Sequence, residues 1–383
     1  MPIALDYDAV AWDSAHAEQS HRVTGRPLVL LGPQSYLGGV YGPSIVKKCP
    51  NVVAVVDDQC REDSIYGVVR WSSSEFRARA ASIPGLLGVD MAGSPFGQTV
   101  FTHLLEQGGV ERADLVDVLA ELGLGAVYQT PREMRERTIA RQSEWGRLRA
   151  ALDDEMSRIT LDAALLLRLT YDRRYVRAAM TAPEDEYFGI YASASTFRLR
   201  DDETIADCGA YVGSTVRKAI AATDGRFRSI HAFEPDRRSF SALEKLNSLK
   251  MAGIALYNSA VGDRTGNIAF IQTGTMGSHV DETTGSDANT TVVRLDDVLD
   301  EVSFIKMDLE GFEQRALRGA TRLIAEFRPR MAITAYHYAD DLLDVWQLLS
   351  EVAPDYELRL RHHSSYYYDT IFYASPRKRS GVR

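Results

Sequence analysis

Short apolar segments alternate with stretches of helical spacing throughout the second half of the chain. Seven of them have the length and composition of buried strands: residues 203–209, 229–235, 254–261, 303–310, 330–337, 356–364 and 367–375. Strands that alternate with helices pair in parallel and build a doubly wound α/β sheet. The last two segments are separated by too few residues for a parallel crossover, so they should pair antiparallel. We therefore expect a mostly parallel sheet with one reversed strand at its end.

A shorter pattern of the same kind comes earlier in the chain. Strand-like segments at residues 28–31, 51–58 and 85–93 predict a small Rossmann-like α/β domain. A chain of 383 residues is also too long for one compact core. The expected organisation is an N-terminal arm at 1–25, the small α/β domain at 26–130, a helical connector at 131–182 and the larger α/β domain at 183–383.

Composition excludes several classes of protein. The net charge of −9 provides no basic surface for nucleic acid or an anionic membrane. No apolar run approaches the ~20 residues that a membrane-spanning helix needs, and the acidic first twenty residues do not resemble a signal peptide. Three cysteines without metal-ligand spacing argue against a disulfide framework. We therefore expect a cytosolic protein that binds neither nucleic acid nor membranes.

The segment at 203–209 ends in a glycine-containing loop typical of nucleotide-like ligands. Asp207, Gly209 and Gly213 lie between the strand and a predicted helix, and Glu234 ends the next strand. That acid lies at about the 20-residue offset at which a carboxylate meets ribose hydroxyls. Asp207 would repel a pyrophosphate, but it suits a ligand with an amine and a cationic centre. S-adenosyl-L-methionine has both, although a glycine after a strand can also serve only as a turn.

Several longer motifs resemble the FkbM-type S-adenosylmethionine-dependent methyltransferases. They include "IADCGAYVGST", "HAFEPD", "NSAVGDRTGNIAF", "FIKMDLEGFEQRALRGA" and "RPRMAITAYHYADDL", and the resemblance covers residues 186–375. It implies a seven-stranded sheet whose last strand is antiparallel. It also implies methyl transfer to hydroxyls of secondary metabolites, sugars or glycan precursors.

The resemblance also implies which residues hold the cofactor. They are Asp207, Gly209, Ala210, Tyr211 and Gly213 at the methionine end, Glu234 and Pro235 at the ribose, and Ser259, Ala260 and Val261 at the adenine. Asp308 is a further cofactor-binding candidate, because its place at a strand end would face the gap where the methyl group points. Cys208 stands where the family has a small or apolar residue, and we interpret it as packing.

Candidates for chemistry lie where the later strands end, because ligands bind at the carboxyl ends of parallel strands. Asp308 and Glu310 close one segment and His337 closes the next. Methyl transfer needs an aligned acceptor and removal of its proton, so we expect His337 and Asp308 to be catalytic. In the alternative interpretation, Asp308 caps a helix and His337 is a core histidine. Of His362 and His363, adjacent on a strand, at most one can face the site.

Two further alternatives concern the same region. Asp308, Glu310, His337 and one late histidine would also suit a divalent metal, but nothing in their spacing requires one and we expect none.

The polar segment at 272–291 is either a linker or a mobile loop over the acceptor, with Met276, Ser278 and His279 as weak contact candidates.

The first domain contains a pattern that only partly matches a dinucleotide-binding signature. Gly32 and Gly38 are too widely spaced, although Asp58 is placed suitably for a ribose. A second nucleotide or acceptor site, a homodimerisation module and a degenerate scaffold all remain open as its role.

The sequence thus predicts an S-adenosylmethionine-dependent O-methyltransferase that acts on a small-molecule acceptor. N-methyl transfer, a nicotinamide-dependent oxidoreductase acting through the first domain, and a non-catalytic binding protein are the alternatives.

Overall fold

The computed structural model describes residues 23–125, 128–191, 196–249, 251–271, 279–280 and 290–377, together with residues 5, 7 and 12. The chain divides into two compact units. The first comprises Met1–Ser143, Ile159–Met180 and Ser364–Tyr368, and the second comprises Glu144–Arg158, Thr181–His363 and Asp369–Arg383. The domain boundaries expected from the sequence stay a prediction.

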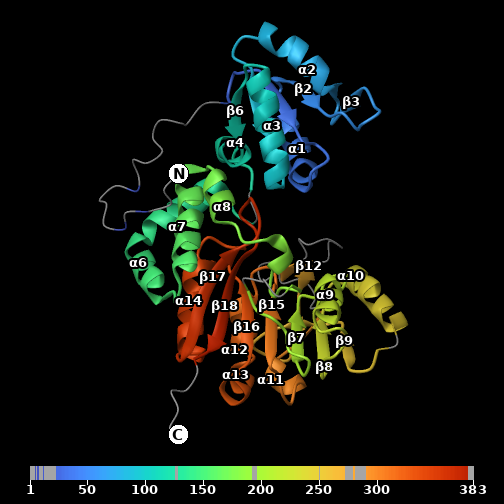
Figure 1. The fold of residues 1–383 in the computed structure, drawn as a ribbon, viewed down its shortest axis with the longest axis vertical. Helices are drawn as coiled ribbons and strands as arrows, with labels where there is room; N and C mark the ends of the chain where they lie inside the picture. Colours follow the sequence, from blue (N-terminus) through green and yellow to red (C-terminus); the bar gives the residue numbers. More distant parts are fainter. Residues whose placement is uncertain are drawn as a thin grey trace. The chain divides into compact units, whose positions relative to one another are not determined.

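The first unit is built on a six-stranded sheet of order β3-β4-β2-β1-β5-β6. Its strands are β1 Leu28–Leu31, β2 Val52–Val56, β3 Ser64–Ile65, β4 Val68–Trp71, β5 Leu87–Asp90 and β6 Glu111–Asp114. All neighbours pair in parallel except β3 and β4. Its helices are α1 Tyr36–Lys48, α2 Ser73–Arg79, α3 Pro95–Gln107 and α4 Leu115–Leu122, with a 3-10 turn, η2, at Ala80–Ser82 (Figure 1). This is the small Rossmann-like sheet that the sequence predicts.

Helices follow in the segment where a connector was expected. They are α5 Pro131–Ala140, α6 Gln142–Ala151, α7 Glu155–Thr170 and α8 Arg174–Ala179, followed by the short η3 Pro183–Asp185. In the described part of the chain, no helix is long and apolar enough to cross a membrane.

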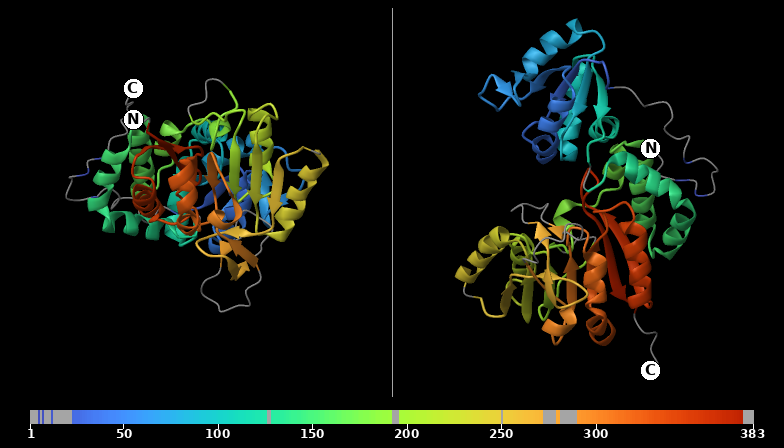
Figure 2. Two further views of the ribbon diagram at one scale, coloured as in Figure 1. Left: turned by 90° about the horizontal axis from the view of Figure 1, so that it is seen from below. Right: turned by 180° about the vertical axis from the view of Figure 1, so that it is seen from behind.

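The second unit contains a seven-stranded sheet of order β17-β18-β16-β15-β7-β8-β9, whose strands are labelled in Figure 1. Figure 2 shows the same ribbon from two further directions. Its strands are β7 Thr204–Cys208, β8 Ser229–Phe233, β9 Ile254–Tyr257, β15 Phe304–Met307, β16 Arg330–Thr334, β17 Tyr356–His362 and β18 Thr370–Pro376. Only β18 runs antiparallel to its neighbours, β16 and β17. The predicted fold class, with an antiparallel last strand, is confirmed. The reversed strand lies second from the edge because β17 continues the sheet beyond it.

Small strands and helices complete this unit. The strands β10 Ala260–Val261, β11 Gly266–Ile268 and β14 Thr290–Val293 form one small sheet, and β12 Phe270–Ile271 pairs with β13 His279–Val280. The helices are α9 Ser214–Ala222, α10 Arg237–Leu243, α11 Leu295–Val298, α12 Glu313–Arg318, α13 Thr321–Phe327 and α14 Asp341–Val352, with η4 at Glu244–Leu249.

Residues 313–327 do not form one continuous helix. Apolar side chains at Leu317, Ala320, Ile324 and Phe327 predict a single amphipathic helix, but the chain forms α12 and α13 with a break at Gly319. A Cβ atom at Gly319 would lie only 1.9 Å from the Gly262 carbonyl oxygen, so the backbone at Gly262 packs directly against the chain at this position. The expected apolar stripe is also shorter, because Phe327 is 40% exposed.

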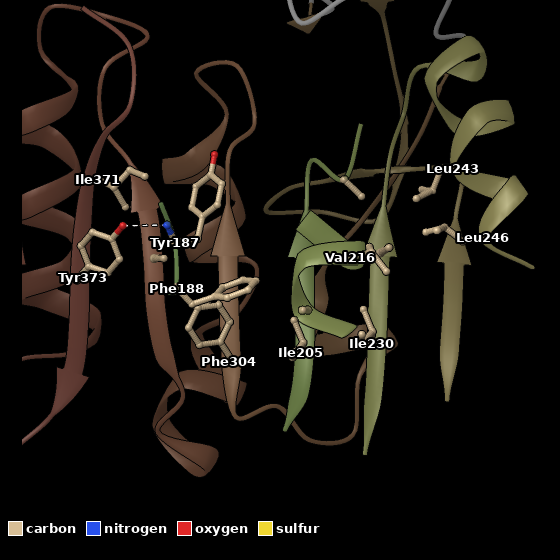
Figure 3. Packing of buried hydrophobic residues seen from close by; sticks show 14 residues of the cluster. Tyr187, Phe188, Ile205, Val216, Ile230, Leu243, Leu246, Phe304, Ile371 and Tyr373 are labelled. Carbon is tan, nitrogen blue, oxygen red and sulfur yellow. Dashed lines mark hydrogen bonds between the residues drawn. The ribbon is translucent and has the colours of Figure 1, made fainter. Parts of the chain in front are cut away.

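The core beneath the strand ends holds β7, β8 and β15 together. Ile205, Ile230 and Phe304 come from these strands, and the helices contribute Val216, Leu243 and Leu246 (Figure 3). The segment before β7 is anchored in the same core, because the Tyr187 amide donates to the Tyr373 hydroxyl at 2.9 Å. The Phe188 and Phe304 rings pack edge to face. The site described next therefore rests on a rigid, apolar base.

Candidate active site

The loop after β7 has the backbone conformation that its glycines suggest. Gly209 and Gly213 both have φ of +83°, and Tyr211 has φ of +49°. A Cβ atom at Gly209 would lie 1.9 Å from the Asp308 carbonyl oxygen. Glycine is therefore required at position 209 by the close approach of two strand ends, and this requirement does not depend on a ligand.

Asp207 and Lys306 form a buried ion pair on adjacent parallel strands. The two residues are directly opposite in the β7–β15 register, and the Lys306 ammonium lies 3.2 Å from Asp207 Oδ1. Burial raises the pKa of Asp207 and the ammonium of Lys306 opposes this effect. Burial alone would lower the pKa of Lys306, but the charge of Asp207 outweighs it and raises that pKa. Both carboxylate oxygens of Asp207 are buried, and neither accepts a hydrogen bond from the described residues.

Glu234 follows β8 and ties the glycine loop to that strand. Its Oε2 accepts from the Tyr211 amide and its Oε1 from the Asp236 amide, both at 2.8 Å. Burial raises the pKa of Glu234 to about 7, against the effect of these two hydrogen bonds. The carboxyl group therefore shapes the loop in addition to any role toward a ligand.

The predicted adenine-side residues follow β9. Ser259 is buried and Ala260–Val261 form β10, which pairs in parallel with β14. The Ser259 hydroxyl is buried and has no hydrogen-bond partner among the described residues. A buried hydroxyl without a partner is costly in a folded protein, and a bound ligand would satisfy it. Cys208 is fully buried, which raises the pKa of its thiol and agrees with a packing role.

Asp308 follows β15 directly and is held by two tyrosines. The Tyr187 hydroxyl donates to its Oδ2 at 2.7 Å, and the Tyr336 hydroxyl donates to its Oδ1 at 3.2 Å. Its side chain keeps 24% of its surface exposed, and that of Glu310 keeps 25%. Both carboxylates therefore remain accessible at the strand end.

His337 lies three residues beyond the end of β16, surrounded by three carboxylates. Its Nδ1 lies 3.2 Å from Glu313 Oε1, and its Nε2 lies 3.4 Å from Asp308 Oδ1 and 3.5 Å from Glu310 Oε2. The side chain is only 1% exposed. Burial lowers the pKa of His337, but the carboxylates, Glu313 first, outweigh it and raise the pKa to about 10. The ring is therefore a protonated imidazolium at neutral pH.

The structure thus brings together Asp308, Glu310 and His337, as the shared strand-end edge predicts. It adds Glu313, which the sequence reasoning missed. Glu313 begins α12, is buried, and its Oε1 accepts from the Leu309 amide at 2.6 Å and the Thr334 hydroxyl at 3.0 Å. Lys306 was missed as well, although a lysine inside the apolar strand "SFIKMD" was a usable signal.

Three residues around this group have a left-handed backbone. Tyr187 has φ of +61°, Glu310 +54° and Asp369 +63°. Such conformations are costly for residues with a side chain and concentrate at functional sites. The pKa of Asp369 is raised by burial and by the charges of Glu186 and Asp308. Strain and like charge are therefore concentrated where the candidate chemistry lies.

The metal alternative involves some of the same atoms. Ligand atoms of Asp308, Glu313 and His337 lie within 4.8 Å of one another. A metal bound there would replace a proton on a ring whose nitrogens both face carboxylates. The late histidines are engaged elsewhere: His362 Nδ1 lies 2.8 Å from the Thr370 hydroxyl, and His363 Nε2 lies 2.8 Å from the Tyr373 hydroxyl. Burial lowers the pKa of His363 to about 4.

Three weak acceptor candidates cannot be placed. Met276 and Ser278 lie outside the described residues, and for His279 only the backbone, in β13, is described. Their predicted contacts stay predictions.

In the first unit, packing explains most of the partial dinucleotide signature. A Cβ atom at Gly38 would lie 2.1 Å from the Gly32 carbonyl oxygen, so glycine is needed where α1 meets the turn after β1. Asp58 accepts from the Ser73 amide at 2.7 Å and from the Ser73 hydroxyl at 2.5 Å, and these hydrogen bonds lower its pKa. Its carboxylate is thus engaged at the start of α2.

Comparison with known proteins supports a methyltransferase fold and a resemblance to one methyltransferase family. A solved structure of a methyltransferase FkbM from Methylobacillus flagellatus KT matches with a TM-score of 0.73 and 26% identity, covering 91% of this chain and 89% of that chain. The second unit therefore has a methyltransferase-like fold. Residues 207–356 match the family model described as the methyltransferase FkbM domain. This match confirms the resemblance to the FkbM methyltransferases over those residues.

Weaker structural matches and one negative result complete the comparison. Fibrillarin from Aeropyrum pernix, solved with natively bound S-adenosyl-L-methionine, matches with a TM-score of 0.31 and 11% identity, over 47% of this chain and 68% of that chain. An rRNA methylase from Streptococcus thermophilus matches with a TM-score of 0.30 and 14% identity, over 46% of this chain and 87% of that chain. The search among curated proteins found no match.

Proposed function

We propose that the protein is an S-adenosylmethionine-dependent O-methyltransferase that acts on a hydroxyl of a small-molecule acceptor, such as a sugar or natural product. The observation that carries the proposal is the row of groups at the ends of β7, β8 and β9, within the residues that match the FkbM family model. Asp207 Oδ2 is buried without a hydrogen bond, Glu234 follows at the next strand end, and the Ser259 hydroxyl is buried without a partner.

These groups fit the chemistry of the cofactor. Asp207 would bind its α-amino group, since a buried carboxylate oxygen without a donor suits an ammonium. Glu234, supported by Pro235, would accept hydrogen bonds from the ribose hydroxyls. Ser259, Ala260 and Val261 would border the adenine. When bound, S-adenosylmethionine supplies an electrophilic methyl group, and the remaining steps fall to the residues of the chain.

The acceptor-side residues are suited to removing a proton from a hydroxyl. A protonated His337 cannot accept that proton at neutral pH, so we now assign it a positioning role in place of the expected role as base. Asp308 and Glu310 are partly exposed carboxylates fixed by the imidazolium, and we propose that one of them accepts the proton. Hydrogen bonds from Tyr187 and Tyr336 orient Asp308. Two fixed carboxylates favour a hydroxyl acceptor over an amine, which can lose its proton to solvent.

Isothermal titration calorimetry tests the cofactor assignment directly. S-adenosylmethionine and S-adenosylhomocysteine should bind in a 1:1 ratio, whereas NAD and NADP should not. Binding of a nicotinamide dinucleotide without binding of either adenosyl ligand would overturn the proposal in favour of the oxidoreductase alternative. Mass spectrometry after incubation with hydroxyl- and amine-bearing acceptors then separates O- from N-methylation.

A further inference from the structure

Lys306 is a buried cation that the proposed chemistry does not use. Its neighbours on β15 are Phe304, Ile305 and Met307, all buried and apolar. The ammonium nevertheless lies in the sheet, 2% exposed as a side chain. An apolar residue would suit this strand position at least as well, because replacing a buried ion pair by apolar side chains is often neutral or stabilising. The lysine therefore calls for an explanation other than fold stability.

The ammonium contacts three consecutive residues of the glycine loop. It donates to the Gly209 carbonyl at 2.6 Å and to the Cys208 carbonyl at 3.3 Å, and it lies 3.2 Å from Asp207 Oδ1. An ammonium has three protons, and the two carbonyls accept hydrogen bonds from it. The contact with Asp207 Oδ1 is an ion pair. Neither oxygen of Asp207 accepts a hydrogen bond from the described residues, but Oδ1 is the oxygen whose ion pair with Lys306 is observed. Lys306 thereby holds Asp207 through the charge at Oδ1, and Oδ2 is left to face a ligand.

We propose that Lys306 is a positioning residue for the amino-acid end of the adenosyl ligand. By holding Asp207 and the Gly209 carbonyl, it presents Asp207 Oδ2 to the ligand's α-amino group. This inference rests on the proposed function, and it assigns Lys306 no contact with the nucleoside end. Glu234 and Ser259, which would serve that end, have no hydrogen bond with Lys306 in the described contacts. The Lys306 charge helps to lower the pKa of Glu234, so the affinities are compared at pH 8.5, where Glu234 is ionised with or without it.

The test compares two ligands that differ only beyond the adenosine. S-adenosylhomocysteine carries the amino-acid end, and 5′-methylthioadenosine lacks it. In Lys306→Met, the affinity for S-adenosylhomocysteine should fall on the order of ten- to a hundredfold, as expected for a lost charge-assisted contact. The affinity for 5′-methylthioadenosine should change by less than about twofold, because this ligand lacks the amino-acid end that Asp207 would bind. Lys306→Gln keeps two donors, so it should partly restore S-adenosylhomocysteine binding.

Lys218→Met provides the matched control. Lys218 is another partly buried lysine of the second unit, and its ammonium donates to the Glu186 carbonyl. Its replacement should leave the ratio of the two affinities unchanged. Circular dichroism and thermal melting establish that each variant is folded, and Lys306→Gln provides the comparison if Lys306→Met does not fold.

The outcomes separate the inference from the proposed function. Unchanged S-adenosylhomocysteine binding in a folded Lys306→Met protein would overturn the inference, and so would an equal loss for both ligands, which indicates a structural role. If the unmodified protein binds neither ligand, the proposed function itself fails.

Discussion

Replacing His337 by glutamine should destabilise the protein strongly at neutral pH. Glutamine keeps a hydrogen-bonding side chain of similar size but removes the positive charge between Glu313, Asp308 and Glu310. Glu313 is buried, and His337 helps to lower its pKa against the opposing effect of burial. Removing one partner of a buried ion pair leaves an uncompensated charge and costs ~3–5 kcal/mol. The expected loss is therefore a large fraction of the total free energy of unfolding of a typical domain.

The pH dependence gives a second, independent value for the contribution of His337 to the free energy of unfolding. The pKa of His337 is about 10 in the folded protein and has an ordinary value of 6.5. Because folding raises this pKa, the stabilisation is complete below pH ~6.5 and is lost as the pH rises toward 10. One pKa unit corresponds to ~1.4 kcal/mol, so the contribution at pH 7 is ~4 kcal/mol. This value agrees with the ~3–5 kcal/mol expected for breaking the buried ion pair.

Urea unfolding of both proteins at pH 7, 8.5 and 10 measures this contribution. The difference in free energy of unfolding between the unmodified protein and His337→Gln should shrink steadily over this range. His231→Gln is the matched control, because His231 is partly buried in the same unit and burial lowers its pKa. Its effect should be constant from pH 7 to 10. If the His337→Gln difference is also independent of pH, then the ring is neutral in the folded protein and our assignment of its role is wrong.

The remaining predictions concern the candidate cofactor and acceptor residues. Gly209→Ala should lower the melting temperature and abolish S-adenosylhomocysteine binding, since the new Cβ would lie 1.9 Å from the Asp308 carbonyl oxygen. Glu234→Ala should weaken S-adenosylmethionine by ~2–4 kcal/mol in calorimetry, because it removes a charged acceptor. Asp308→Asn should lower kcat by roughly 10²–10⁴ with little change in cofactor affinity, as expected for loss of a proton acceptor or its orientation. EDTA should leave turnover unchanged, and restoration of a lost activity by a divalent ion would favour the metal alternative.

The parts of the site that the sequence predicts are those that follow from sheet topology. Parallel strands end at one edge, so residues that directly follow a strand lie close together whatever the loops do. Asp308 follows β15 immediately, and Tyr336 and His337 follow β16, which pairs with β15 in parallel. Their proximity could therefore be predicted without any knowledge of side-chain orientation. The same logic predicts that Asp207 and Glu234 flank the glycine loop.

The parts that could not be predicted depend on contacts across long sequence distances. Glu313 faces His337 only because the turn after β15 directs the first residue of α12 back toward β16. The protonation state of His337 depends on that contact, so a histidine expected to act as base becomes a fixed cation. The break at Gly319 lies where the Gly262 carbonyl, more than fifty residues earlier in the chain, approaches the helix too closely for a side chain. Helical periodicity within one segment contains no information about such a neighbour.

Two carboxylates at the edge of this sheet, Asp207 and Asp308, each lie beside a buried cation. We infer that these cations stabilise the sheet edge and leave the carboxylates available for binding and proton transfer. Lys306 lies beside Asp207, and His337 lies beside Asp308. Both carboxylates are at strand ends, and burial raises the pKa of Asp207 while Lys306 opposes that effect. A fixed positive charge lies beside each carboxylate without covering every oxygen, so Asp207 Oδ2 remains available and Asp308 stays partly exposed. If this arrangement serves binding and proton transfer, then loss of Lys306 should affect ligand affinity and loss of His337 should affect stability and turnover. If both substitutions changed only the free energy of unfolding, the two cations would stabilise the fold and would have no role in the proposed activity.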